Sequence, residues 1–405
     1  MRIKQTLIRF CLLGAAMLIL PSAAQAQLVL TTNNGTISIV SNSCVSGNFM
    51  VPSATNSYPI TSIGDNAFFG CASLGGITIP DSVTNLGAVV FEGCPSLTNV
   101  TIGNGVASIE TNTFAECNNL TSVTIGNGVT SIGAEAFILC ESLGGITIPD
   151  NVTNIGPSVF ANCRGLTNAI IGNGVTSIGQ FAFQACYGLT NVTIGDSVTS
   201  IGVDAFVSCT SLTSIILPNS VTNLGGGAFD NCVNLTNVIL NSNITNIEDG
   251  TFAECLGLTR ITIPSNVTSL GQAAFLNSTN LSSVYFAGNA PTVGSITFSN
   301  DVNVIAYYLP GTTGWSAFAT NAGVRTMMWT PVIQASGPNF GVQNNQFGFN
   351  LTGSNNFTVI VETCTNPASP VWIPLQTVTL TNGSFYFSDP QWTNYPARFY
   401  GLGLP

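Results

Sequence analysis

Apolar residues recur along most of this chain with a period of 23 residues. The repeating unit reads V-T-S-I-G-x-x-A-F-x-x-C-x-x-L-T-x-V-T-I-G-N-G, and ten copies in unbroken register cover residues 60–289. A unit of this length cannot bury its own apolar residues, so neighbouring units must stack and share a core. The pattern therefore predicts a repeat solenoid.

Each part of the unit predicts its own local structure. The L-T-x-V-T-I segment alternates apolar and polar residues and is rich in β-branched side chains, which is typical of a short strand. The G-N-G or P-D-S that follows has the composition of a turn. Phe and Cys lie three residues apart in A-F-x-x-C, which predicts one or two helical turns. We expect the strands to stack into one parallel sheet, with neighbours about 4.8 Å apart.

The form of the unit resembles the BspA-like bacterial subclass of leucine-rich repeats, and the resemblance covers residues 60–289. It implies an α/β repeat solenoid with a parallel strand sheet on one side and short helical turns on the other. It also implies a secreted or cell-surface protein that acts in adhesion or binding. The function is an expectation by analogy, because a fold does not fix a function.

The two ends of the array require covers, because an open end exposes core and strand edges. Residues 27–59 are predicted to form an N-terminal cap, with strands at Leu28–Leu30 and Thr36–Ile39. After Asn289 the pattern decays, and we expect residues 290–330 to hold a degenerate repeat and a C-terminal cap.

The composition changes at about Pro331, and residues 331–405 are predicted to form a small β-sandwich-like module. Short alternating segments predict its strands, and Asn382-Gly383 predicts a hairpin turn. Its terminal P-A-R-F-Y resembles small modules that end other secreted bacterial proteins. A spacer is favoured over a sorting element or a carbohydrate-binding unit. The expected aromatic core consists of Trp372, Phe385, Phe387 and Phe399.

Residues 1–26 have the pattern of a secretory signal peptide. Basic residues at Arg2, Lys4 and Arg9 precede an apolar run over residues 10–20, and Ala24-Gln25-Ala26 is a small-x-small cleavage site. The run is short for a membrane anchor, which is the alternative. We therefore expect a secreted or cell-surface protein with no membrane insertion after cleavage.

Charge and composition narrow the possible functions. Residues 27–405 hold four Arg and all 17 acids, so their net charge is 4 − 17 = −13, which argues against nucleic acid and anionic membranes as partners. Histidine is absent from the chain, which removes the usual acid–base and metal-binding side chain. Asp81, Asp150 and Asp196 occupy the turn slot and are interpreted as turn formers. We expect the protein to have no enzymatic activity and to bind no cofactor or metal ion. A glycosidase that uses a pair of carboxylates is the disfavoured alternative.

Cysteine recurs once per unit in nine of the ten units. The slot lies on the core side, so buried thiols are favoured over disulfides between successive units. A zinc site is disfavoured because the cysteines are not closely spaced in pairs and no other type of zinc ligand accompanies them. Cys44 and Cys364 lie outside the period and are expected to be unpaired. The periodic residues are Cys71, Cys94, Cys117, Cys140, Cys163, Cys186, Cys209, Cys232 and Cys255.

The outward face of the strands is the candidate functional surface. The side chains in its N-terminal half are small and neutral, whereas the C-terminal half has residues typical of contact patches. The hypothesis is a monomeric protein that binds an extracellular protein or glycan there. The alternatives are ordinary β-forming residues on a solvated face, and a structural envelope or matrix component without a specific ligand. The candidate residues are Ile170, Ile216, Ile239, Arg260 and Tyr285.

Overall fold

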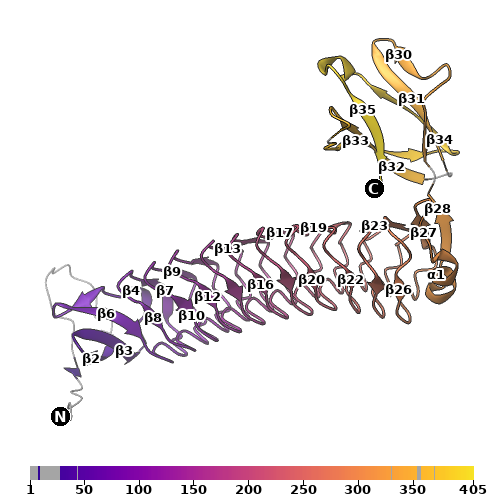
Figure 1. Cartoon of the computed structure of the whole chain (residues 1–405). Helices are drawn as coiled ribbons and strands as arrows, with labels where there is room; N and C mark the ends of the chain where they lie inside the picture. The colour runs from indigo at the N-terminus through magenta and orange to yellow at the C-terminus, as the bar shows by residue number, and fades with distance from the viewer. Residues whose placement is uncertain (1–7, 10–27, 43, 330, 354–356, 369) are drawn as a thin grey trace.

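The computed structural model shows an elongated solenoid that ends in a separate β module (Figure 1). It describes residues 8–9, 28–42, 44–329, 331–353, 357–368 and 370–405. The predicted signal peptide lies outside the described residues except for β1 (Ile8–Arg9), which pairs with β2 (Leu28–Asn33). The predicted parallel-strand solenoid followed by a small β-sandwich-like module is confirmed.

Five strands build the N-terminal end. β2 forms an antiparallel hairpin with β3 (Thr36–Asn42), and β5 (Ala54–Thr55) forms one with β6 (Tyr58–Ile63). β3 then pairs in parallel with β6, while β4 (Gly47–Met50) pairs in parallel with the first strand of the main sheet. The β2–β3 hairpin therefore covers the edge at β6, and β4 covers the first edge of the main sheet.

One strand per coil forms the main ladder, in which paired residues lie 23 positions apart except between the last two strands, where they lie 22 positions apart. Asn99, for example, pairs with Ser122 and Thr101 with Thr124. The first and last strands of this ladder pair with β4 and with β28 (Arg325–Met328). In order, the strands are β7 (Leu74–Ile79), β9 (Asn99–Ile102), β11 (Ser122–Thr124), β13 (Gly145–Ile148), β15 (Asn168–Ile171), β17 (Asn191–Thr193), β19 (Ser214–Ile216), β21 (Asn237–Ile239), β23 (Arg260–Ile263), β25 (Ser283–Phe286) and β27 (Ile305–Tyr308).

A second ladder of two-residue strands follows the turn of each coil. These strands also pair in parallel with the neighbouring coil, and each places its second residue in the core. They are β8 (Asn85–Leu86), β10 (Ser108–Ile109), β12 (Ser131–Ile132), β14 (Asn154–Ile155), β16 (Ser177–Ile178), β18 (Ser200–Ile201), β20 (Asn223–Leu224), β22 (Asn246–Ile247), β24 (Ser269–Leu270) and β26 (Thr292–Val293).

The A-F-x-x-C segment contains consecutive turns rather than the predicted helical turns. Two residues four apart in each coil adopt left-handed backbone, for example Glu135 (φ 58°) and Leu139 (φ 59°), and this interrupts any helix. The N–H of Phe137 between them donates to the carbonyl of Val159 in the next coil at 2.9 Å. Hydrogen bonds therefore run along the stack on this side too, and they satisfy the buried backbone without a helix.

The interior is one continuous apolar core. Ten periodic phenylalanines, from Phe68 to Phe275, are fully buried, and their rings stack at 5.1 to 5.7 Å between centroids. Leucine and the β-branched strand residues fill the remaining layers. Burial of this column drives the stacking, because no single coil encloses its own phenylalanine.

The C-terminal end of the core is covered by α1 (Trp315–Ala322), the only α-helix among the described residues. Phe298 continues the ring stack beyond Phe275 at 5.3 Å, and Phe318 of α1 meets Phe298 at 6.5 Å in a T-shaped contact. Trp315 and Phe318 also pack against Phe286 of β25. The helix therefore places aromatic rings where a further coil would otherwise stack.

The module consists of two antiparallel sheets. One has β31 (Gln346–Thr352) at its centre, with β29 (Val332–Gln334), β30 (Gly341–Gln343) and β34 (Ser384–Asp389) around it. The other has the order β33 (Ile373–Leu380), β32 (Phe357–Cys364), β35 (Phe399–Gly403). A 3-10 turn, η1 (Trp392–Asn394), leads towards β35. Asn382 and Gly383 both have positive φ, as a tight turn between strands requires.

The expected aromatic core of the module was only partly right. Phe387 is buried, but Phe385 is only half-buried, and Trp372 and Phe399 are each 41% exposed. The interior is made instead by Phe349 and Phe357 with aliphatic residues of β31, β32 and β33. Trp372 precedes β33 and lies against Gly401 on the outer side of the sheet, because a register shift between β32 and β33 reverses the alternation before this residue.

Candidate functional site

The outward face of the main ladder is open over most of its length. Ile170, Ile216 and Ile239 are exposed, and Ile216 is 60% exposed. They point outward because each lies between two residues that face the core. Arg260 begins the next strand, is exposed, and forms no ion pair with any described residue. The structure thus brings Ile216, Ile239 and Arg260 onto consecutive strands.

Tyr285 is not part of this open surface, and its expected exposure was wrong. It is only 2% exposed, and its ring lies 5.1 Å from Tyr307 and 5.6 Å from Phe357. Phe357 belongs to β32 of the module, so the module covers this end of the strand face. Burial raises the pKa of the Tyr285 hydroxyl, and the residue acts as part of the joint between solenoid and module.

A groove of about 910 Å³ lies where the open strand face meets the module. The solenoid contributes Ile239, Arg260 and Thr262, and the module contributes Ile360 and Leu404. The hydroxyl of Thr262 donates to the carbonyl of Pro405, which fixes the module strand against the solenoid. Figure 1 shows this corner, with β35 and the C-terminus close to β23. The groove combines apolar walls with a single cation, the guanidinium of Arg260.

Several acids of the repeats serve as backbone acceptors. The side chain of Asp81 accepts the N–H of Asn104 at 2.7 Å, and Asp150 accepts that of Asn173 at 2.7 Å. Each link joins one coil to the next, so these carboxylates hold turns together. Across the described ranges, no group of three or more Cys, Asp or Glu side chains is placed to hold a metal ion.

One acid of the repeats with a raised pKa lies away from the groove. Burial, together with repulsion from Glu254 and Asp204, raises the pKa of Asp230 to about 6. Perturbed acids can mark catalytic sites, but structural burial perturbs them as well. The residues that line the groove include no Asp or Glu side chain.

The periodic cysteines form a column of buried thiols from Cys94 to Cys255, as expected. Each thiol donates to the carbonyl of a phenylalanine in the preceding coil, as Cys163 does to Phe137 at 3.2 Å. Burial raises the pKa of Cys163 and of Cys232 to about 12, so both remain protonated and unreactive at neutral pH. Cys364 is free, as predicted, and it is buried.

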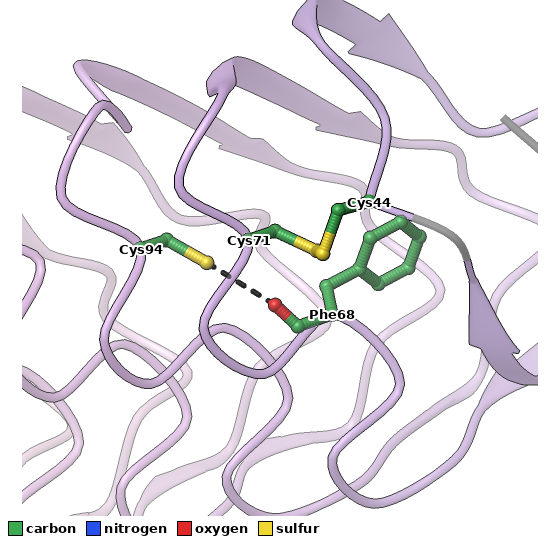
Figure 2. Close-up of a disulfide and its surroundings, with 4 residues drawn as sticks. All are labelled: Cys44, Phe68, Cys71 and Cys94. Carbon is green, nitrogen blue, oxygen red and sulfur yellow. Dashed lines mark hydrogen bonds between the residues drawn. A yellow bond between two sulfur atoms is a disulfide. The ribbon is translucent and has the colours of Figure 1, made fainter. Parts of the chain in front are cut away.

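Cys44 contradicts the expectation that it is unpaired, because it forms a disulfide with Cys71 (Figure 2). The two Cα atoms lie 5.0 Å apart, although the residues are separated by 27 positions. The first periodic cysteine therefore leaves the thiol column and ties the N-terminal cap to the first coil.

The P-A-R-F-Y segment supplies a buried polar cluster that the sequence alone did not reveal. Arg398 forms an ion pair with Asp389 at 3.0 Å, and both side chains are almost completely buried. The hydroxyl of Tyr400 donates to the same carboxylate at 2.8 Å, and Arg398 also donates to Thr363. This cluster ties β35 to β34 and β32, and so joins the two sheets of the module. Its role is structural.

No helix within the described ranges is long and apolar enough to cross a membrane.

Comparison with known proteins agrees with the repeat pattern. A family model for the BspA type leucine rich repeat region matches residues 38–167 and 176–305, in six copies. No curated protein matches the chain.

Solved structures of bacterial leucine-rich repeat proteins are also similar. A leucine rich cell surface protein from Faecalibacterium prausnitzii is 26% identical, with 77% of this chain and 100% of that chain covered and a TM-score of 0.40. A leucine rich repeat protein from T. pallidum is 26% identical over 46% of this chain and 87% of its own, with a TM-score of 0.43. One from Bacteroides ovatus is 23% identical over 74% and 98%, with a TM-score of 0.43.

Proposed function

Because the chain belongs to the BspA-type leucine-rich repeat family, we propose that it is a non-enzymatic extracellular binding protein. Its ligand is a protein or a glycan, held on the C-terminal half of the strand face. The observation that carries this proposal is the groove between Ile239, Arg260 and the module. The basic and apolar N-terminus supports a location outside the cytoplasm.

The groove has the chemistry of a recognition site. Ile216 and Ile239 are exposed, and a ligand that covers them buries their apolar area. This burial favours binding by roughly 25 cal/mol per Å². Arg260 offers a forked donor set that suits a carboxylate or a row of hydroxyl groups, and no ion pair to a described residue competes for it. The volume of about 910 Å³ accommodates a short oligosaccharide or a protein loop.

The N-terminal half of the same face favours a second proposal, in which the protein is a structural component without a specific ligand. Thr101, Thr124 and Thr147 form a flat, neutral row there, and their hydroxyls are ordinary for an exposed β surface. In this reading the repeats set the length of a spacer, and the module is only its terminal cover.

The two readings separate in a binding experiment. Residues 27–405 are immobilised and probed with arrays of extracellular matrix proteins and of glycans. Any ligand found is then measured against the double variant Ile239→Asp, Arg260→Glu. The matched control is Thr101→Asp, Thr147→Glu, which adds the same side chains to the distant half of the face.

We expect the groove variant to bind at least roughly tenfold more weakly and the control to bind like the parent, because only the groove residues contact the ligand. Equal binding by the parent and the groove variant contradicts the proposed site. Absence of any ligand on both arrays favours the structural component.

A further inference from the structure

The outer face of the module sheet β33–β32–β35 carries an exposed tryptophan and a carboxylate above two glycines. Gly401 and Gly403 lie two residues apart on β35, so both leave the same side of the sheet without a side chain. Neighbouring side chains occupy the two vacant positions. Trp372 lies over Gly401, and the carboxylate of Glu362 lies over Gly403.

The indole of Trp372 lies with its face towards the sheet. A Cβ placed on Gly401 would meet three consecutive atoms of the six-membered ring, at 2.9, 3.0 and 3.3 Å. A point beyond the ring edge would be much farther from the outer two atoms than from the middle one. The nearly equal distances therefore place the glycine against the ring face. Because Trp372 is still 41% exposed, its opposite face is open to solvent.

Glu362 adds a hydrogen-bond acceptor beside this platform. Its Oε1, Cδ and Oε2 lie 2.5, 2.7 and 3.1 Å from the Cβ position of Gly403, so the carboxylate rests on the sheet. It makes no hydrogen bond or ion pair with a described residue, and its partial burial raises its pKa. Leaving a partly desolvated carboxylate without a donor is unfavourable, so a ligand that supplies hydroxyl donors is favoured there.

We propose that this face of the module binds a neutral glycan by stacking one pyranose ring on Trp372 while Glu362 accepts hydrogen bonds from its hydroxyl groups. The C–H face of a pyranose is flat and weakly positive, and it complements the negative face of an indole. Glu362 gives this face a negative charge, and the guanidinium of the module, Arg398, is committed to Asp389. Anionic polysaccharides are therefore disfavoured.

The glycines are part of this site, because they allow both side chains to lie flat. A side chain at position 401 would push the indole away from the sheet and tilt the stacking face. Glycine in a strand otherwise weakens it, so the two glycines on one face of β35 have a local purpose. The site shares the outer face of this sheet with Ile360, which lines the groove, but it uses none of the solenoid residues, so the solenoid side of the groove can be changed without altering it.

The experiment uses residues 27–405 in affinity electrophoresis through gels that contain xylan, mannan or β-1,3-glucan, with retention on cellulose as a fourth probe. Three variants are compared with the parent: Trp372→Ala, Gly401→Val and Tyr386→Ala. The last is the matched control, because Tyr386 is an aromatic residue, 42% exposed, on the other sheet of the module. A proline-rich peptide serves as the competing probe.

We expect at least one polysaccharide to retard the parent, with roughly tenfold weaker binding for Trp372→Ala. Gly401→Val weakens binding although it keeps the tryptophan, and Tyr386→Ala binds like the parent. The double variant Ile239→Asp, Arg260→Glu also binds like the parent, which keeps this test independent of the groove. Unchanged thermal unfolding shows that each variant is folded.

Three results overturn the proposal. The first is that no probe polysaccharide retards the parent, and the second is that Trp372→Ala, while folded, is retarded like the parent. The third is that only the proline-rich peptide binds, since this makes the platform a peptide site.

Discussion

Removing one ring from the phenylalanine column should divide the solenoid into two weakly coupled halves. Phe160 is the best position, because it is fully buried in the middle of the array. Its ring stacks on Phe137 at 5.4 Å and on Phe183 at 5.2 Å. Phe160→Ala therefore removes contacts with the coil on either side at once.

The magnitude follows from burial and from the two stacked pairs. A buried Phe→Ala change costs about 3–5 kcal/mol. Each stacked pair contributes about 0.5–1.5 kcal/mol beyond its buried area, so two broken pairs place the loss near the upper end of that range. In a linear array, stability is carried by contacts between neighbours, so the loss falls on the two interfaces around this coil. Phe69→Ala is the control, because Phe69 is 55% exposed.

The assay is urea unfolding followed by two signals. All four tryptophans, at positions 315, 329, 372 and 392, lie in the C-terminal part of the chain, whereas far-ultraviolet circular dichroism reports on the whole solenoid. In the parent we expect the two signals to change together, because neighbouring coils share one core. In Phe160→Ala we expect circular dichroism to fall at lower urea than tryptophan fluorescence, because the N-terminal half separates first.

A loss below about 1 kcal/mol would refute this reasoning, because it would mean that the ring is not enclosed by its neighbours. If the variant lost the full amount, about 3–5 kcal/mol, but its circular dichroism and fluorescence transitions still coincided, the separation into two halves would be refuted. The contribution of the stacked rings to stability would stand.

Two further predictions concern buried polar groups. Both carboxylate oxygens of Asp301 are buried without a hydrogen-bond partner among the described residues, and burial raises the pKa of this group to about 7. Because the folded pKa lies above the unfolded value of about 3.9, stability falls as pH rises from about 4 to 7. Asp301→Asn should remove that fall and raise the melting temperature at pH 8 but not at pH 4, and equal gains at both pH values would contradict the assignment. Arg398→Met should destabilise the module by about 3–5 kcal/mol in urea unfolding, because it leaves Asp389 buried and unpaired. A loss like that of the exposed change Phe340→Ala would show that the pair contributes little.

The sequence predicted the repeat architecture because one pattern is present ten times in the same register. The strand ladder, the buried phenylalanine column and the buried thiols all follow from that register. The A-F-x-x-C segment was predicted less well, because the residues in its left-handed positions differ between coils. Val89, Glu135 and Phe181 share one such slot with Gly227, so no single residue type marks it.

The remaining differences depend on contacts that lie outside the period. Cys44 reaches Cys71 through a cap whose length differs from that of a coil, so the spacing of 23 did not indicate the pair. Tyr285 is buried because the module folds back onto the last strands, and nothing in the repeat specifies that docking. Trp372 was placed in the core on aromatic content, whereas a register shift between β32 and β33 puts it outside.

The central claim is that all the coils share one sealed interior, so that only the outer faces of the solenoid and module are available for binding. Titration of thiols in residues 27–405 tests this claim directly, because nine free cysteines are buried within the described part of the chain and Cys44 is joined to Cys71. In native protein without reductant, we predict no thiol that reacts rapidly with a disulfide reagent, and nine that react after denaturation. Rapid native reaction of several thiols, or fewer than nine after denaturation, would contradict the stacked interior.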